Sequence, residues 1–370
     1  MCMIKPLLSF ITLLLAANSY AQIYLNPGVD TSLVEVKQAL RFYNKYVAGF
    51  NGKNIPDMAK YWPQSEVKLR KVPDQLIYAI NDYPLYSMGC QLTILYIRPT
   101  ANYVHIKTQF SVPDSLKNVM TMAIANYYVA FDKNHQPYFK NPLTTQLAGW
   151  RSRAVRNITY YYPTYHTFNA KRADSLITSV ARLEKEWGLT PINIRYYLAN
   201  NKDELYKLQG FDYTVMMGNK EAPSGKSDDK DNQVFCGGLG ENYFHEVVHL
   251  YLNHLYPKSP LQEGLAVFYA GSMGHTVKWH LKTVNEYLNK HPETDLTDLD
   301  NFWYTDPFTN PGSAIQGMLC SMIFKKDGIA GLKRLMQYNS YKEIFKKEFN
   351  IDTAQINAFL KKSIADESVN

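Results

Sequence analysis

Residues 245–249 contain two histidines and a glutamate at a spacing that suits a metal ion. The sequence there is His-Glu-Val-Val-His, with His245 and His249 four positions apart and Glu246 directly after the first histidine. In a helix, side chains four positions apart project from the same face, so both imidazoles can reach one ion. Glu246 lies beside that face, where its carboxylate can take a proton from a metal-bound water. This spacing indicates metal-assisted hydrolysis, whereas the alternative is a pair of core histidines bonded to backbone carbonyls.

A zinc site needs a third protein ligand, and several residues downstream are candidates. His254 follows His245 by nine positions, which points it to the opposite side of the same helix. A third-histidine pattern also requires glycine and histidine at positions where this chain has Leu252 and Leu255. Asp295 is the first aspartate available to an aspartate pattern, and it is not suitably placed. Neither a further histidine nor an aspartate therefore completes the site.

Glu263 is the ligand that the local sequence places best. Pro257 ends the first helix, and the following residues predict the start of a second one, with Ser259 as its N-cap and Gln262 completing a capping box. Glu263 then falls in the first turn of an antiparallel helix and faces the histidines. Gly264 beside it allows the two helices to approach closely. The alternative for Glu263 is an ordinary acidic residue at a helix N-terminus, where negative charge is favoured.

The segment from His245 to His249, followed by Leu261–Phe268 with its Glu263, resembles the metal-binding helices of the glutamate zincins. These are the metallopeptidases related to thermolysin and aminopeptidase N, and the chain is most similar to their short-gap, bacterial peptidase MA-like members. The resemblance extends over roughly residues 156–365. It implies a zincin-like metallopeptidase domain with a helical lobe.

The resemblance also implies a role for each residue of the motif. Glu246 would be the general base that takes a proton from the zinc-bound water and passes it to the leaving amine. The strand at Gln233–Cys236 would be the sheet edge that pairs with an extended peptide or protein substrate. The Zn²⁺ ion would be held by the side chains of His245, His249 and Glu263.

The chain departs from this family in two respects. Thirteen residues separate His249 from Glu263, fewer than in thermolysin, so the connection between the helices is short. The family also places a tyrosine or histidine to polarise the scissile carbonyl, where this chain has Ser313. Tyr304 and His275 are the alternatives for that role. The second hypothesis is therefore a zincin-fold protein that binds a partner without catalysis.

The elements that must position these residues form an α+β pattern in two expected domains, residues 22–155 and 156–370. The second domain begins with strands and helices in alternation and ends in amphipathic helices that continue to about Leu360. Its expected elements are strands at Ile158–Tyr162, Ile192–Leu198 and Gln233–Cys236, helices at Asn169–Trp187 and Lys202–Leu208, and a polar loop at 220–232.

The first domain is expected to pack helices on one face of an antiparallel sheet. Its expected elements are helices at 29–49 and 55–62 and strands at Leu76–Ile80, Gln91–Ile97, Tyr103–Phe110, Met120–Phe131 and Pro137–Phe139. The element order, with Phe42-Tyr43 and Asn51-Gly52-Lys53, shows a weaker resemblance to the cone-shaped fold of nuclear transport factors and scytalone dehydratase. Such a domain either mediates contacts or encloses a small ligand.

Residues 1–21 predict a signal peptide. Lys5 precedes an apolar stretch, Leu7–Leu15, that is too short to span a bilayer, and Ser19-Tyr20-Ala21 has small residues where a signal peptidase cuts. We therefore expect a periplasmic or secreted protein. Removal of the peptide leaves an odd number of cysteines, which allows at most one disulfide: Cys90, Cys236 and Cys320.

The composition excludes several functional classes. Hydrophobic residues make up 46% of the chain and charged residues 20%, which are the proportions of a globular protein rather than a disordered one. The net charge of +7 comes from 40 basic and 33 acidic residues that are scattered along the chain. A nucleic-acid partner requires a concentrated basic face, so we expect none, and we expect no membrane insertion.

Overall fold

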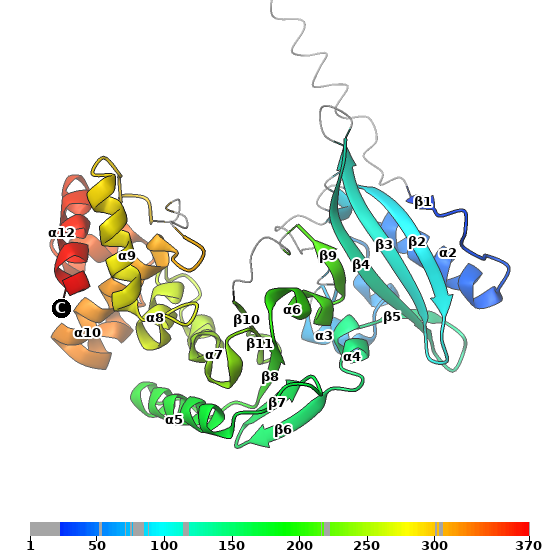
Figure 1. Ribbon diagram of the computed structural model, residues 1–370, viewed down its shortest axis with the longest axis horizontal. Coiled ribbons are helices and arrows are strands. Elements are labelled where there is room, and N and C mark those ends of the chain that lie inside the picture. The colour runs from blue at the N-terminus through cyan, green and yellow to red at the C-terminus, as the bar shows by residue number, and fades with distance from the viewer. Residues whose placement is uncertain are drawn as a thin grey trace, which may run out of the picture. The chain divides into compact units, whose positions relative to one another are not determined.

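The computed structural model describes residues 23–51, 54–70, 72–74, 76, 85–87, 89–113, 118–215, 217, 223–299, 302 and 306–369. This part of the chain is a mixed α/β protein with two β-sheets, which is compatible with the α+β class expected from the sequence (Figure 1). It divides into two compact units. The expected signal peptide at residues 1–21 lies outside the described residues. Among the described helices, none has the length and apolar character needed to cross a membrane.

The first unit holds the described residues of Met1–Ala148 and Tyr206–Lys220. Its strands are β1 (Ile23–Leu25), β2 (Gln91–Pro99), β3 (Val104–Pro113), β4 (Val119–Phe131), β5 (Pro137–Lys140) and β9 (Phe211–Thr214). Its helices are α2 (Val34–Ala48), α3 (Gln64–Leu69) and α4 (Pro142–Gln146), with 3-10 turns η1 (Met58–Lys60) and η3 (Leu85–Ser87). Strands β2 to β5 confirm the four strands predicted between Gln91 and Phe139, and they form two antiparallel hairpins, β2–β3 and β4–β5. Of the strand expected at 76–80 only Leu76 is described, and Gly52 and Lys53 also lie outside the described residues.

The core of the first unit forms between α2 and the sheet. One face of α2 is buried because its apolar and aromatic residues recur at helical spacing, among them Val36, Tyr43 and Tyr46. Several hydroxyl groups in this core bond to one carboxyl group: Tyr46 Oη donates to the buried Asp74 Oδ2 at 2.6 Å, and Tyr127 Oη donates to the same oxygen at 3.1 Å. The interior is therefore packed with aromatic rings whose hydroxyl groups share one carboxyl group.

The division between the units differs from the expected boundary at residue 155. Strand β9 comes late in the sequence but pairs with β4 of the first sheet, where Ala125 lies opposite Phe211. Phe211 is buried in the core of the first unit, and Asn126 Nδ2 donates to Gly210 O at 3.1 Å. Strand β6 (Arg151–Val155), which we expected in the first domain, pairs with a strand of the second sheet. Short strands carry no sequence signal for their partner, so local patterns did not predict either pairing.

The second unit holds the described residues of Gly149–Leu205 and Glu221–Asn370. Its sheet has the strand order β10-β11-β8-β7-β6, formed by β6, β7 (Ile158–Tyr162), β8 (Ile194–Ala199), β10 (Ser224–Asp228) and β11 (Gln233–Gly237). The three central strands run parallel, and the two outer strands pair antiparallel to them. Strands β7, β8 and β11 confirm the three strands predicted in this region.

The predicted position of the sheet edge was wrong. Strand β11, which includes Gln233–Cys236, lies between β8 and β10, and every residue of it is buried. The edge strand next to β11 is β10, which forms from part of the segment predicted as a polar loop. Polar residues are tolerated on an edge strand because one side of it faces solvent, so composition alone made this strand look like a loop.

Helices form the rest of the second unit (Figure 1). They are α5 (Ala170–Trp187), α6 (Lys202–Leu208, which crosses the division), α7 (Phe244–Leu252), α8 (Gln262–Ala270), α9 (Val277–Lys290), α10 (Pro311–Leu335), α11 (Tyr341–Glu348) and α12 (Ile356–Val369). Short 3-10 turns occur at η4 (Gly240–Asn242), η5 (Asn253–Leu255) and η7 (Thr353–Gln355). Helix α5 begins at its Asn169 cap and ends at Gly188 in the left-handed conformation, as its sequence predicts.

Candidate metal centre

Helix α7 carries the two histidines and is buried along its whole length. The helix is apolar on most faces, so packing fixes its position in the core of the second unit. His245, Glu246 and His249 are buried with it, at 3%, 6% and 8% exposure. Buried polar side chains of this kind need partners, which makes the surroundings of each of them informative.

Helix α8 follows after a short turn, but it does not start as predicted. Its N-cap is Leu261, and no side chain among the described residues caps it at that position. The Ser259 hydroxyl instead accepts from the Leu261 N–H at 3.3 Å. Gln262 Nε2 reaches back to the preceding turn and donates to Tyr256 O at 2.8 Å. The predicted capping box is therefore wrong, because these two polar side chains tie the connection between the helices together rather than cap α8.

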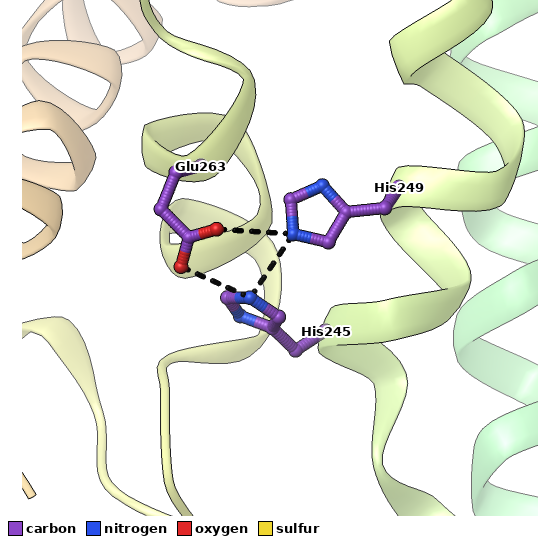
Figure 2. Close-up of side chains that lie close together, drawn as sticks. All are labelled: His245, His249 and Glu263. Carbon is purple, nitrogen blue, oxygen red and sulfur yellow. Dashed lines mark hydrogen bonds and ion pairs between the residues drawn. The ribbon is translucent and has the colours of Figure 1, made fainter. Parts of the chain in front are cut away.

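The turn between α7 and α8 nevertheless brings Glu263 to the histidines, as the sequence predicts. The Nε2 atoms of His245 and His249 lie 3.1 Å apart. Glu263 Oε1 lies 3.2 Å from His245 Nε2, and Glu263 Oε2 lies 3.2 Å from His249 Nε2. Figure 2 shows the three side chains pointing toward one common position, with the Glu263 carboxylate facing both imidazoles. One ligand atom from each residue lies within 4.8 Å of those of the other two.

The hydrogen bonds of the other ring nitrogens determine the tautomers. His245 Nδ1 lies 2.8 Å from the Gly271 carbonyl oxygen, which only accepts, so Nδ1 carries the proton. His249 Nδ1 donates in the same way to Asn253 Oδ1 at 3.1 Å. In the neutral rings, both Nε2 atoms therefore present lone pairs to each other and to Glu263. Two facing lone pairs beside a carboxylate repel unless a proton or a cation lies among them.

These separations fit a tetrahedral zinc ion. With zinc–nitrogen and zinc–oxygen distances of about 2.0–2.2 Å, two ligands of a tetrahedral ion lie about 3.3 Å apart. The distances that join His245, His249 and Glu263 are within about 0.2 Å of this value. Two imidazoles and one carboxylate leave a fourth position for water, which is the ligand set of catalytic rather than structural zinc sites.

The charges in the cluster stabilise one another. Burial alone would lower the pKa of His245, but the hydrogen bond and charge of Glu263, together with the charge of Glu246, raise it to about 9. Burial alone would raise the pKa of Glu263, but its bonds to His245 and His249 and their charges hold it well below its usual value. The centre therefore favours positive charge between an ionised carboxylate and the imidazoles.

Glu246 lies where α7 meets the edge strand β10. A Cβ atom placed on Gly225 of β10 would lie 2.6 Å from Glu246 Oε1 and 2.2 Å from Tyr243 Cε1. The Tyr243 ring stacks on His245, with centroids 5.6 Å apart and planes 12° apart. Burial, and next the charge of Glu246, raise the pKa of Tyr243 well above its usual value, so its phenol stays neutral. Gly225 thus leaves the space that the carboxylate of Glu246 and the ring of Tyr243 occupy.

The other residues that the sequence singled out lie elsewhere. His254 is exposed in η5 and is not part of the described cluster, as expected. His275 stacks on Trp279 at 3.8 Å, and Ser313 is buried in the first turn of α10, where its N–H donates to Asn310. Tyr304 lies outside the described residues. The three cysteines that the structure describes are buried and free: Cys90, Cys236 and Cys320.

Several residues around the centre were not predicted from the sequence. Asn253 lies four positions after His249, a helical spacing that could have identified it as a partner of that imidazole. No sequence pattern predicted the Gly271 carbonyl or Gly225. A backbone carbonyl, or a glycine that leaves space for its neighbours, can be recognised only once the fold shows what lies beside it.

A comparison of the chain with family models, with curated proteins and with solved structures finds no match. The case for the metal centre therefore depends on its sequence pattern and its geometry.

The proton on His245 makes metal affinity depend on pH. A metal ion must displace that proton, and raising the pH removes it, so apparent zinc affinity should rise about tenfold per pH unit from about pH 6 to about pH 8. The rise should level off near the His245 pKa of about 9. Competition with a chelator of known zinc affinity measures this slope. A flat or falling profile would contradict the assigned protonation.

Proposed function

We propose that this protein is an exported zinc metallopeptidase of the glutamate-zincin type. The observation that carries the proposal is the meeting of two imidazole Nε2 atoms and the Glu263 carboxylate around one position, with His245 and His249 each oriented by a second hydrogen bond. Such outer bonds fix the ring and its tautomer in zinc proteins. Export is supported by the signal-peptide pattern of residues 1–21.

In this proposal His245, His249 and Glu263 bind the metal, and Glu246 transfers the proton. A zinc ion held by His245, His249 and Glu263 would supply a Lewis acid and lower the pKa of a bound water to about 7. Glu246, the next residue after His245 on the same buried helix, accepts the proton of the attacking water and passes it to the leaving amine. Burial of the helix keeps bulk water away from this carboxylate and strengthens its electrostatic interactions.

The substrate of this proposal is an extended peptide that adds to β10. Strand β10 is one of the two edge strands of its sheet, and among the described strands only β11 pairs with it, so residues 224–227 have no strand partner on the side away from β11. A peptide can pair with such an edge through main-chain hydrogen bonds. Gly225 of β10 contacts Glu246 and Tyr243, so a strand added there runs beside the general base.

A second candidate function is a zincin-fold protein that binds a partner without catalysis. It is favoured by the positions of Ser313 and His275, neither of which belongs to the described cluster. The first unit has no assigned chemistry in this proposal, and it either mediates contacts or binds a small ligand. Metal binding is common to both candidates, and peptide cleavage distinguishes them.

Zinc content tests the ligand set. Purified wild-type protein should contain about one zinc per chain, and His249→Ala should lose it because two ligands hold zinc far more weakly than three. His254→Ala is the matched control, since this exposed histidine lies on the next turn and should leave the zinc content unchanged. Elemental analysis measures all three proteins. Absence of zinc from the wild type, even after loading, would remove the proposed site.

Peptide cleavage tests the role of Glu246. Wild-type protein should hydrolyse members of a mixed peptide library, and Glu246→Gln should lower the rate by at least about a hundredfold, because the amide cannot accept the proton. Mass spectrometry detects the products, and zinc analysis checks that the variant keeps its metal. Zinc in both proteins with cleavage by neither would favour the non-catalytic candidate.

The close approach of β10 to Glu246 predicts that activity is sensitive to a side chain at position 225. Gly225→Ala would push the new methyl group against Tyr243 and Glu246, so we expect kcat to fall about tenfold or more while zinc content is kept. Ser227→Ala, on the same strand, is the control and should retain activity. Equal activity of both variants would show that the space at Gly225 does not matter to the general base.

A further inference from the structure

The first turn of α8 contains Glu263, yet its N-cap position provides no side-chain bond among the described residues. The N–H groups in the first turn of any helix lack partners within that helix. In α8 the Gly264 N–H is such a group, and it is buried. A buried N–H without an acceptor is destabilising, so the acceptor for Gly264 indicates what holds this turn in place.

That acceptor comes from α10, 52 residues later in the chain. Gln316 Oε1 accepts from the Gly264 N–H at 3.1 Å. The amide nitrogen of Gln316 donates to Tyr341 Oη at 2.7 Å, and Tyr341 Oη donates to Pro260 O at 3.1 Å. Because Tyr341 takes the amide nitrogen, the amide oxygen must face Gly264. Gln316 of α10 thus bonds to Gly264, and Tyr341 of α11 bonds to Pro260, so the start of α8 is held at both residues.

Close backbone packing adds to these bonds. A Cβ atom on Gly264 would lie 2.4 Å from Gln316 Cβ and 2.7 Å from its carbonyl carbon. A Cβ atom on Gly317 would lie 2.7 Å from Val267 Cγ1. Helices α8 and α10 therefore touch at their glycines, which leaves little room for the first turn of α8 to shift or rotate.

We propose that Gln316 is a positioning residue for Glu263, the third ligand of the metal centre. Its amide, oriented by Tyr341, fixes the first turn of α8 so that the Glu263 carboxylate reaches both imidazoles. This inference rests on the proposed metal function. A metal site tolerates errors of only about 0.2 Å in its ligand distances, so a small shift of this turn weakens binding.

Titration with Co²⁺ against a competing chelator, followed by visible absorption, tests the inference. Gln316→Leu removes both bonds of the amide and should weaken Co²⁺ binding about 10–100-fold and change the absorption bands. Tyr341→Phe keeps the bond from Gly264 but frees the amide of Gln316 to rotate. It should therefore weaken Co²⁺ binding by about threefold or more, but by less than Gln316→Leu does. Asp352→Ala removes the cap of η7 and is the control for lost stability alone. Its affinity should stay within about twofold of the wild type.

Two results would overturn the inference. The first is that Gln316→Leu folds and is less stable to heat but binds Co²⁺ with wild-type affinity and wild-type absorption bands. Gln316 would then have a structural role only. If Gln316→Leu does not fold, wild-type affinity of Tyr341→Phe decides against the inference. A wild-type protein that binds neither Co²⁺ nor Zn²⁺ would overturn the proposed metal function itself, and that failure is recognised in the wild-type titration before any variant is considered.

Discussion

The interaction on which the second unit depends is the approach of two buried imidazole nitrogens and one partly exposed carboxylate. His245 Nε2 and His249 Nε2 lie 3.1 Å apart, and the Nδ1 atom of each ring donates a hydrogen bond. Lone pairs this close repel, so the arrangement needs positive charge at the point where they meet. Glu263 supplies the compensating negative charge at 3.2 Å from both rings. A core of apolar residues would not require this geometry, which is why it indicates chemistry rather than packing.

The surrounding fold holds each residue of the candidate centre through a different element. The turn after α8 offers the Gly271 carbonyl to His245, the end of α7 offers Asn253 to His249, and α10 reaches the first turn of α8 at Gly264. None of these supports belongs to the short motif itself. A ligand set fixed in this way needs little reorganisation when it binds an ion, which is the usual condition for tight binding and for catalysis.

Sequence patterns predicted the parts of the fold that depend on local periodicity. The helix α5, the strands β7 and β8, the strands β2 to β5 of the first unit and the shared face of His245 and His249 belong to this group, because spacing alone determines which face a side chain occupies. Glu263 was predicted from an expected second antiparallel helix, and it lies beside the histidines although that helix does not start as predicted. Strands β9 and β10 and the start of α8 were not predicted. Strand β9 depends on β4 and the start of α8 on Gln316, and both partners are distant in sequence. Strand β10 pairs with the next strand, β11, but its polar residues are typical of a loop.

The most direct test of the metal centre is X-ray absorption at the zinc edge of the zinc-loaded protein. We predict nitrogen and oxygen neighbours at about 2.0–2.2 Å, with the outer-shell scattering that two imidazoles produce. The result that would contradict the centre is sulfur at about 2.3 Å, or a spectrum without imidazole scattering. Sulfur neighbours would place the ion at one of the buried cysteines, such as Cys236, and not at His245, His249 and Glu263.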